Sequence, residues 1–326
     1  MRLKSDIMEK KEITELRSVK VFAPATVTNV GCGFDVLGFA LEHPGDVVHL
    51  QQTDRHSHIF ISIVGKDVDN IPVQPEQNTA GVPLLQMKKD FGIHVGLDVT
   101  IEKKLGIGSG LGSSAASAVG AVVAMNECFG LKLSPKQMLR YCAMGEAISS
   151  DGNIHIDNIA AALYGGFVFI HDAKKMEVIS LPPIDEMYAV VLYPHLELKT
   201  STMRKILKKD IPLSTAVAQW ANLGAFIIGW HRKDYQMIKQ SMQDVIVEPI
   251  RSQVIPGYDL IKETALEQDA LGCSISGSGP SVFALVTNSD SAKGLKKEWE
   301  KIMKDLEIKH DVYISRINQQ GPEVLS

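Results

Sequence analysis

Residues 106–117 read GIGSGLGSSAAS, with glycine at four alternate positions and two serines directly after the last glycine. Alternate glycines let successive backbone N–H groups converge on an anion, because no Cβ blocks the approach. Ser113 and Ser114 fall where a helix is expected to begin, and the free N–H groups at a helix N-terminus also favour negative charge. The segment indicates a polyphosphate site. The alternative is a tight turn that only lets a helix pack closely on a sheet.

Two common phosphate-binding motifs do not fit this loop. A Walker A loop needs a lysine after its last glycine, but Ser113 follows Gly112. The dinucleotide fingerprint GxGxxG needs glycine or alanine at position 111 or 113, where the chain has Leu111 and Ser113. A loop without lysine has to hold phosphates through backbone amides and leave charge neutralisation to a metal ion such as Mg²⁺. The missing lysine therefore narrows the class of nucleotide site.

Composition excludes several kinds of partner. The chain has 326 residues, of which 45% are apolar and 22% charged, so it suits two domains or one large α/β domain. A net charge of −4 gives no electrostatic footprint for nucleic acid or an anionic membrane. Four widely spaced cysteines show no metal-ligand spacing and are expected to be buried thiols. The first twenty residues are charged and lack the apolar core of a signal peptide, and we expect a cytoplasmic protein.

The coarse secondary-structure pattern predicts an α+β fold. A strand alternating at Val19 and Val21 is expected to break at Pro24, and another strand leads into the glycine loop. Two helices follow, over about 113–129 with Gly130 at its end, and from the capping box at Ser134. This strand, loop, helix, helix order differs from a Rossmann unit. Beyond residue 165, strands mix with helices, including one helix predicted over 216–242, without strict alternation.

Three stretches, in chain order, resemble the motifs of the GHMP kinases, a family of ATP-dependent small-molecule kinases. Residues 23–41 (APATVTNVGCGFDVLGFAL) resemble its N-terminal substrate motif, residues 106–117 its lysine-free ATP loop, and residues 272–285 (GCSISGSGPSVFAL) the third motif, which supports that loop. The resemblance implies a two-domain α+β fold with the active site between the domains. After a leader at 1–17, it predicts an ATP-binding, ribosomal protein S5 domain 2-like domain over 18–185 and a ferredoxin-like domain over 186–326.

The resemblance implies ATP and Mg²⁺ as cofactors. It assigns Mg²⁺ to the side chains of Ser114 and Glu146, and it counts Glu146 among the catalytic residues. The nucleotide-binding positions that it implies lie in the two glycine loops and near the adenine: Asn78, Gly106, Ile107, Gly108, Ser109, Gly110, Leu111, Gly112, Ser113, Ser114, Ala115, Ala116, Gly277, Ser278 and Gly279.

Four further stretches, NVGCGFDVLG, HIDNIAAALYGG, KTSTMRKIL and DVIVEPIRSQVIPGY, resemble the branch of this family that phosphorylates the hydroxyl of L-homoserine to O-phospho-L-homoserine, a step toward threonine. L-Homoserine is a zwitterion, so its site needs a cation for the carboxylate and an anion for the ammonium group. The planar fork of arginine is suited to the carboxylate. The resemblance assigns these roles: Arg204 and Arg251 bind the carboxylate, Asp35 the ammonium group, and Asn29 and Asn158 the hydroxyl, with His155 and Thr200 nearby.

Asn158 bears on the mechanism, because related GHMP kinases place an aspartate general base at the aligned position. An amide cannot accept a proton, and the neighbouring Asp157 is expected to point about 100° away around a helix. We therefore expect Asn158, Asn29 and Glu146 to act by alignment and charge stabilisation, with the hydroxyl proton passing to the γ-phosphate or to water. Two alternatives stay open: another GHMP small-molecule kinase, and a non-catalytic nucleotide-binding regulator on the same fold. The sequence also leaves a homodimer open.

Overall fold

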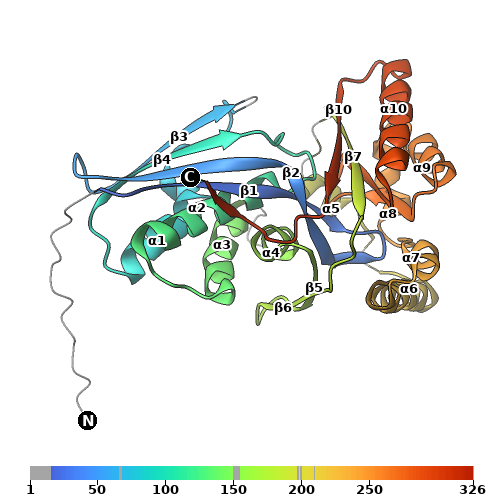
Figure 1. Ribbon diagram of the computed structural model, residues 1–326, viewed down its shortest axis with the longest axis horizontal. Coiled ribbons are helices and arrows are strands. Elements are labelled where there is room, and N and C mark those ends of the chain that lie inside the picture. Colours follow the sequence, from blue (N-terminus) through green and yellow to red (C-terminus); the bar gives the residue numbers. More distant parts are fainter. Residues whose placement is uncertain are drawn as a thin grey trace, which may run out of the picture.

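The computed structural model describes residues 16–65, 68–149, 155–196, 198, 200–208 and 210–325, except for the side chains of Ser149, Thr200 and Ser201. These residues form two β-sheets, each covered by helices, and the two sheets lie side by side along the long axis of the molecule (Figure 1).

The first sheet has the strand order β11-β1-β2-β4-β3, and β5 and β6 extend from the bent strand β2. Its pairs are antiparallel except for β3 and β4. Four α-helices gather on one side of this sheet (Figure 1), and α2 packs directly on β1 and β2. The elements of this part are β1 (Ser18–Asn29), β2 (Gly33–Thr53), β3 (Ile59–Gly65), η1 (Pro75–Gln77), α1 (Gly81–Asp90), β4 (Gly96–Lys103), α2 (Ser113–Phe129), α3 (Pro135–Ser149), α4 (Asp157–Tyr164), β5 (Phe167–Asp172) and β6 (Glu177–Ser180), joined by β11 (Glu323–Leu325) from the end of the chain.

The second sheet is antiparallel, in the order β10-β7-β9-β8. Numbered along the chain, these strands stand in the spatial order 4-1-3-2 with helices between the first two and the last two, which is the ferredoxin-like arrangement and confirms the predicted class. Strand β11, at the end of the chain, pairs with β1 and so belongs to the first sheet. The elements of this part are β7 (Tyr188–Pro194), α5 (Thr200–Lys205), α6 (Leu213–Arg232), α7 (Tyr235–Ser241), α8 (Glu248–Arg251), η2 (Ser252–Val254), α9 (Tyr258–Glu267), β8 (Gly272–Ile275), β9 (Val282–Val286), α10 (Ser289–Asp305) and β10 (His310–Arg316).

Local signals placed the helices around the glycine loop correctly. Helix α2 begins at Ser113 and ends before Gly130, whose φ of 61° suits a glycine C-cap. At the start of α3, the Ser134 N–H donates to Gln137 Oε1 at 2.9 Å, and the Gln137 N–H donates to Ser134 Oγ at 3.4 Å, as in a capping box. The end of α2 and the start of α3 are therefore determined by residues at those helix ends.

Two sequence predictions were wrong. Strand β1 does not break at Pro24 but continues to Asn29, because a register shift between Pro24 and Thr26 accommodates a residue without an N–H donor. The helix predicted over 216–242 is instead the pair α6 and α7. Lys233, in the left-handed region with φ 54°, ends α6, and Asp234 caps α7 by accepting the Met237 N–H at 3.0 Å.

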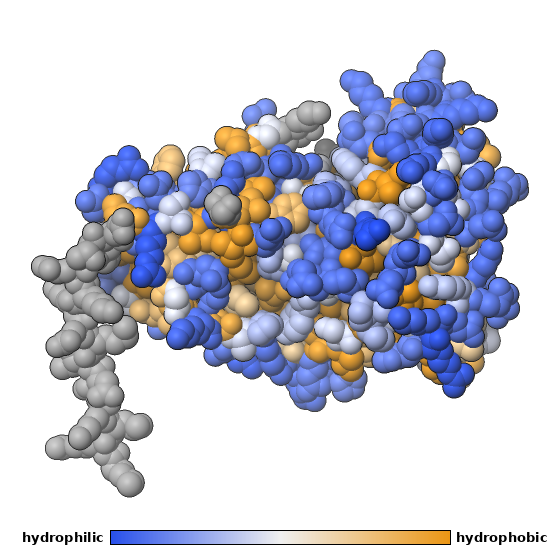
Figure 2. All heavy atoms as spheres, viewed as in Figure 1, coloured by the Kyte–Doolittle hydropathy of each residue, from blue (hydrophilic) through white to orange (hydrophobic). Residues whose placement is uncertain are grey.

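A shared apolar cluster joins the two sheets. Phe39 of β2 stacks on Phe167 of β5 with ring centroids 4.5 Å apart, and it meets Phe283 of β9 edge-on at 5.8 Å. Trp230 of α6 packs on Phe167 from the other side of the cluster. Hydrophilic residues cover the end of the molecule that carries α10 (Figure 2). Among the described residues, no helix has both the length and the apolarity needed to cross a bilayer.

Candidate active site

A cavity of about 520 Å³ opens where the three family-like motifs meet. The Thr26 N–H in β1 donates to Leu111 O in the glycine loop at 3.1 Å, and the Gly277 N–H donates to Thr28 O at 3.2 Å. Ser276 Oγ donates to Gly110 O at 2.7 Å. These hydrogen bonds tie together segments that are far apart in the sequence, so the loop after β8 directly supports the loop before α2.

The glycine loop requires its glycines for two reasons. Gly108, Gly110 and Gly112 have φ values of 66°, 79° and 68°, a region that L side chains rarely adopt. A Cβ on Gly110 would come within 2.5 Å of Ser276 O, and one on Gly112 within 2.1 Å of Thr26 Oγ1. In the described part of the chain, no side chain caps the N-terminus of α2. The first N–H groups of this helix therefore suit phosphate oxygens.

Lys103, which the motif analysis missed, lies beneath the loop and lines the cavity. Its Nζ pairs with the Asp46 carboxylate and donates to Ser113 O at 2.8 Å and to Ser117 Oγ at 3.0 Å. All three N–H donors thus go to protein atoms, and the lysine fixes the first turn of α2. The alternation of buried residues along β4 was a signal for it, because position 103 continues the inward face that contains Ile101.

Ser114 and Glu146 meet at the side of the cavity next to α3. Ser114 Oγ donates to Glu146 Oε2 at 2.8 Å, and both residues line the cavity. Among the described residues, no group of three or more His, Cys, Asp or Glu side chains could by itself hold a metal ion. A hydroxyl and a carboxylate nevertheless fit Mg²⁺, which takes few protein ligands when phosphate oxygens and waters complete its shell.

An ion pair also lines the cavity. Arg204 of α5 binds Asp35 with both terminal nitrogens, Nη2 to Oδ1 at 2.7 Å and Nη1 to Oδ2 at 3.2 Å. Arg204 Nη2 also donates to His155 Nδ1 at 3.1 Å. Because a guanidinium group can only donate, Nδ1 accepts and the proton of His155 sits on Nε2. Burial lowers the pKa of His155, which keeps this ring neutral at pH 7.

Arg251 of α8 lies beside this ion pair and is 2% exposed. Its Nη1 donates to Gly277 O at 2.9 Å, which links the third motif to the part of the cavity that contains the ion pair. Burial, and then repulsion from Arg204, lower the pKa of Arg251 to about 10, so it stays charged at neutral pH. The guanidinium carbons of Arg204 and Arg251 lie 5.5 and 5.4 Å from the ring centre of Phe34, a cation–π partner that sequence reasoning missed.

The first two residues of α4 both line the cavity. Asn158 Oδ1 accepts from Thr26 Oγ1 at 2.7 Å, and its Nδ2 donates to Thr28 Oγ1 at 3.4 Å, so the amide has a fixed orientation. Asp157, expected to point away, also reaches the cavity, because the cavity wraps around the first turn of the helix. It is 4% exposed. Burial, and then the nearby Asp35 carboxylate, raise the pKa of Asp157 to about 6.

Three buried polar atoms around the ion pair have no hydrogen-bond partner among the described residues: His155 Nε2, Asp157 Oδ1 and Arg204 Nε. Leaving a buried polar atom unpaired costs about 1–3 kcal/mol. The set comprises two N–H donors and one acceptor, and all three residues line the cavity. This arrangement fits a small polar ligand that accepts and donates hydrogen bonds here.

Most of the predicted site residues come together in this cavity. Those that line it are Asn29, Asp35, Ile107, Gly108, Ser109, Gly110, Gly112, Ser113, Ser114, Glu146, His155, Asn158, Arg204, Arg251, Gly277 and Ser278. Asn29 also has a positioning role, because its Nδ2 donates to Gly277 O at 2.7 Å and its Oδ1 accepts the Asp35 N–H at 3.1 Å. The side chain of Thr200, at the start of α5, lies outside the described part of the chain.

The remaining predicted residues do not line the cavity. Asn78 is buried, where its Nδ2 donates to Pro72 O at 2.6 Å and its Oδ1 accepts the Ala80 N–H at 2.9 Å, so its side chain organises the start of α1. Residues 70–72 and Thr79 line the cavity instead. The other predicted residues that do not line it are Gly106, Leu111, Ala115, Ala116 and Gly279.

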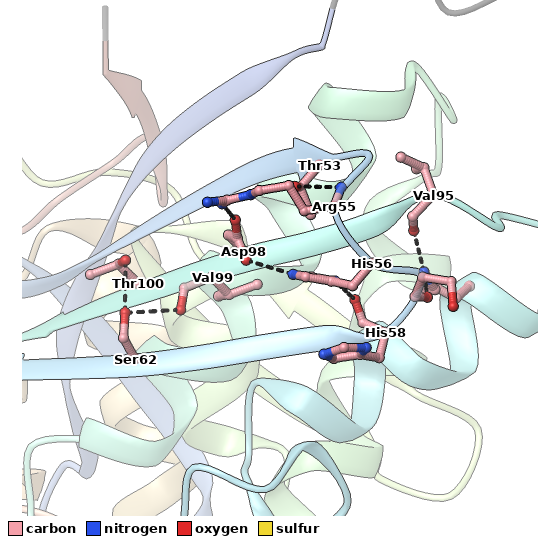
Figure 3. A network of polar contacts seen from close by, with 11 residues as sticks. Thr53, Arg55, His56, His58, Ser62, Val95, Asp98, Val99 and Thr100 are labelled. Atoms are coloured by element: carbon pink, nitrogen blue, oxygen red, sulfur yellow. Dashed lines mark hydrogen bonds and ion pairs between the residues drawn. The ribbon is translucent and has the colours of Figure 1, made fainter.

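The histidine pair His56 and His58 does not line the cavity and lies beside the first residues of β3 and β4 (Figure 3). His56 Nε2 lies 3.0 Å from Asp98 Oδ1, and Arg55 pairs with the other oxygen of the same carboxylate. The two imidazole rings stack with centroids 4.1 Å apart. This network ties the loop after β2 to β4 and contributes no group to the cavity.

Comparisons with known proteins agree with this geometry. The family model "GHMP kinases N terminal domain" matches residues 79–166, and "GHMP kinases C terminal" matches residues 225–305. A homoserine kinase of Chlorobium phaeovibrioides is 38% identical over 95% of this chain and 100% of its own length. One of Methanococcus vannielii is 38% identical over 83% of this chain and 88% of its own length.

Solved structures give the same result. The crystal structure of homoserine kinase from Cytophaga hutchinsonii is 46% identical, covers 94% of this chain and 97% of its own, and superposes with a TM-score of 0.91. The crystal structure of L. major mevalonate kinase in complex with R-mevalonate is 17% identical, covers 91% of this chain and 96% of its own, and shares the fold with a TM-score of 0.72. The chain belongs to the homoserine kinase family of the GHMP kinases.

Proposed function

We propose that this chain transfers the γ-phosphoryl group of ATP to the hydroxyl of L-homoserine and forms O-phospho-L-homoserine, a step in threonine biosynthesis. The observation that carries the proposal is one cavity that is lined both by the glycine loop and by the Arg204–Asp35 pair. The family membership supports it, since relatives named homoserine kinase match the chain over nearly its whole length. A cytoplasmic location and a homodimer stay predictions.

The Arg204–Asp35 pair suits an amino-acid substrate. Both side chains are about one-third exposed, so a ligand can reach them. We propose that the substrate carboxylate binds Arg204 and Arg251, and that its ammonium group binds Asp35. The substrate then replaces one ion pair by two, and its polar groups reach the unpaired Arg204 Nε. An acceptor that lacks either charge forms fewer ion pairs here, so the site favours an amino acid over an uncharged sugar.

Asn158 is the residue that we propose to orient the hydroxyl. Its Oδ1 is held by Thr26 and one Nδ2–H by Thr28, so the second Nδ2–H remains for the substrate oxygen. The unpaired His155 Nε2–H supplies another donor nearby. Neither group accepts a proton at neutral pH, so we propose catalysis by alignment, with the hydroxyl proton leaving to a phosphate oxygen or to water.

The glycine loop positions the nucleotide. ATP supplies the transferable phosphoryl group, and Mg²⁺, when bound, supplies charge neutralisation. We propose that the N–H groups of residues 108–114 hold the phosphates and that Ser114 Oγ and Glu146 Oε2 hold Mg²⁺. Their 2.8 Å contact supports this pairing, because it places a hydroxyl and a carboxylate side by side, and Mg²⁺ prefers such oxygen ligands.

A substrate panel tests the proposal. The purified chain is given ATP and Mg²⁺ with homoserine, mevalonate, galactose or shikimate, and ADP release is measured together with the ³¹P NMR signal of a phosphate monoester. We expect turnover with homoserine, a large increase in KM for homoserine in Arg251→Met, and no change in the exposed control Arg55→Met. Turnover of another acceptor alone, or nucleotide binding without turnover, would overturn the proposal.

A further inference from the structure

Arg251 is a buried cation that has no carboxylate beside it. The residue is 2% exposed, and no carboxylate of the described residues forms an ion pair with it. Its Nη1 donates to Gly277 O at 2.9 Å and its Nε to Met203 O at 3.4 Å, and both acceptors are uncharged. Removing a charge from water is costly unless a partner offsets the loss. Groups other than a paired carboxylate therefore have to offset the burial of this guanidinium group.

The ring of Phe34 lies close to this cation and to a second one. Its centre is 5.4 Å from Cζ of Arg251 and 5.5 Å from Cζ of Arg204. The face of an aromatic ring carries negative partial charge and attracts cations within about 6 Å of its centre. Burial, and then repulsion from Arg204, lower the pKa of Arg251, so the two cations repel one another. One ring therefore attracts two guanidinium groups that would otherwise move apart.

The backbone at the start of β2 brings two consecutive side chains to one arginine. In a regular strand, adjacent side chains point to opposite faces of the sheet. Phe34 and Asp35 are adjacent in β2, and yet both contact Arg204. Asp35 has a φ of 60°, which departs from strand geometry and turns the chain at this point. Left-handed backbone at a residue other than glycine is unfavourable and is typical of functional sites.

Packing in the apolar core does not account for Phe34. The ring is half-buried, and within the described part of the chain it belongs to none of the apolar clusters that form the cores. Phe169 of β5 is half-buried as well, but it packs on the cluster that joins the two sheets and has no cation–π partner among the described residues. The contacts that distinguish Phe34 are therefore those with Arg204 and Arg251.

We propose that Phe34 is a positioning residue that holds Arg204 and Arg251 side by side and leaves N–H donors of this pair free for the substrate carboxylate. A carboxylate at position 34 would offset the two charges more strongly, but it would accept the same N–H groups and compete with the substrate. The aromatic face attracts the cations without taking up their N–H groups as a carboxylate oxygen does. The inference rests on the proposed function, because the ligand it concerns is the carboxylate of homoserine.

Fluorination of the ring is the main test, because it lowers the negative charge of the face and nearly keeps the shape. Phe34 is replaced in the full chain by mono-, di- and trifluorophenylalanine, and steady-state ADP release is measured. We expect KM for homoserine to rise stepwise, to about tenfold for the trifluoro ring, while KM for ATP and kcat keep their wild-type values. Phe34→Leu should show the same split, and Phe34→Tyr, which keeps an aromatic face, should keep the wild-type KM. A KM for homoserine that does not follow the ring charge would overturn the proposal.

Phe169 provides the matched control, since it is a half-buried phenylalanine without a cation–π partner in the described part of the chain. Phe169→trifluorophenylalanine should leave KM for homoserine unchanged. A rise as large as that at position 34 would mean that fluorine acts through packing, and it would overturn the proposal.

A mutant cycle on the protein without ligands tests the contact independently of turnover. Phe34→trifluorophenylalanine should lower the urea concentration at the unfolding midpoint, because the buried charge of Arg251 loses part of its offset. In the Arg204→Met/Arg251→Met background, the same change at position 34 should leave the midpoint where it is, since no cation faces the ring. Equal shifts of the midpoint in the two backgrounds would refute a cation–π contact.

The two measurements separate this inference from the proposed reaction. A wild-type chain that does not phosphorylate homoserine would overturn the proposed function, and the role of Phe34 toward this substrate with it. The urea cycle would then still decide whether the ring holds the two arginines. Turnover of homoserine with a KM that ignores the ring charge would overturn the role of Phe34 alone.

Discussion

Asp157 places a carboxyl group at the cavity with one oxygen unpaired. The sequence did not predict that the Asp157 side chain reaches the cavity. Adjacent residues of a helix point about 100° apart, but this angle does not say how far a cavity extends around the first turn. Arg204, Arg251 and Asp35 were identified from the stretches that resemble the family's motifs. Their mutual arrangement, in which Arg204 pairs with Asp35 across 169 residues of sequence, depends on the tertiary structure.

The proposed alignment mechanism predicts a mild kinetic effect at Asp157. Asp157→Asn should keep kcat within about tenfold of the wild type at pH 7.5, because no proton has to pass to this carboxylate. If Asp157 were a general base, its loss would instead lower kcat by about 10²–10⁴-fold. Steady-state ADP release with saturating homoserine measures the difference, with the exposed Asp259→Asn as the control. A loss of more than a hundredfold in kcat, with KM unchanged, would make Asp157 the proton acceptor.

The raised pKa of Asp157 also predicts a pH-dependent stability. The folded protein holds this proton up to about pH 6, whereas the unfolded chain releases it near the ordinary value of 3.8. Folding is therefore favoured by this group below pH 3.8, and that contribution is lost as the pH rises through 6. Relative to the wild type, Asp157→Asn should gain about 3 kcal/mol in the free energy of unfolding between pH 3.5 and pH 8. Urea unfolding at both pH values measures it, and a pH-independent difference would contradict the prediction.

At the scale of elements, the ends of α2 and α3 followed from the sequence because their signals are local: Gly130 after the last turn and the Ser134–Gln137 capping box. The two wrong predictions, a strand break at Pro24 and a continuous helix through Lys233 and Asp234, concern features that depend on tertiary contacts instead of local signals. A bulge that admits proline depends on the partner strand, and the break between α6 and α7 depends on which faces the two helices bury.

The close contact of the two glycine loops predicts the effect of a single methyl group. Gly110→Ala should raise KM for ATP at least tenfold, because its Cβ would lie 2.5 Å from Ser276 O and push the loops apart. Gly130→Ala is the matched control, since Gly130 also has a positive φ of 61° but nothing within 4 Å of its Cβ. It should lose about 1–2 kcal/mol of stability with KM for ATP unchanged. Equal changes in KM for both variants would mean that backbone strain, rather than the loop contact, is responsible.

At the scale of the whole molecule, the two sheets share one apolar cluster around Phe39, Phe167 and Phe283, and β11 brings the end of the chain back to the first sheet. The cavity lies where the sheets meet, with groups from β1, α4, α5 and α8 around it. The two sheets therefore have to be held in a fixed relation if the groups that line the cavity are to face one another.

This shared cluster predicts cooperative unfolding. Calorimetry should show one transition, with equal calorimetric and van't Hoff enthalpies, because unfolding of either sheet would expose the cluster that both sheets share. Phe39→Ala should cost about 3–5 kcal/mol and lower Tm without splitting the peak. Two separate transitions in the wild type would show that the sheets are independent folding units.

The sequence by itself determined the α+β class and the helix ends near the glycine loop, and it predicted a phosphate site in that loop and, through the motif resemblance, charged residues that suit an amino-acid substrate. These depend on local backbone chemistry, on periodicity and on motif order. Only the tertiary structure decided that Lys103 fixes the start of α2, that Asn78 organises α1 instead of lining the cavity, and that Asp157 and Phe34 belong to the site. Each of these depends on which side chains meet across long stretches of sequence, and packing sets that relation where local pattern does not.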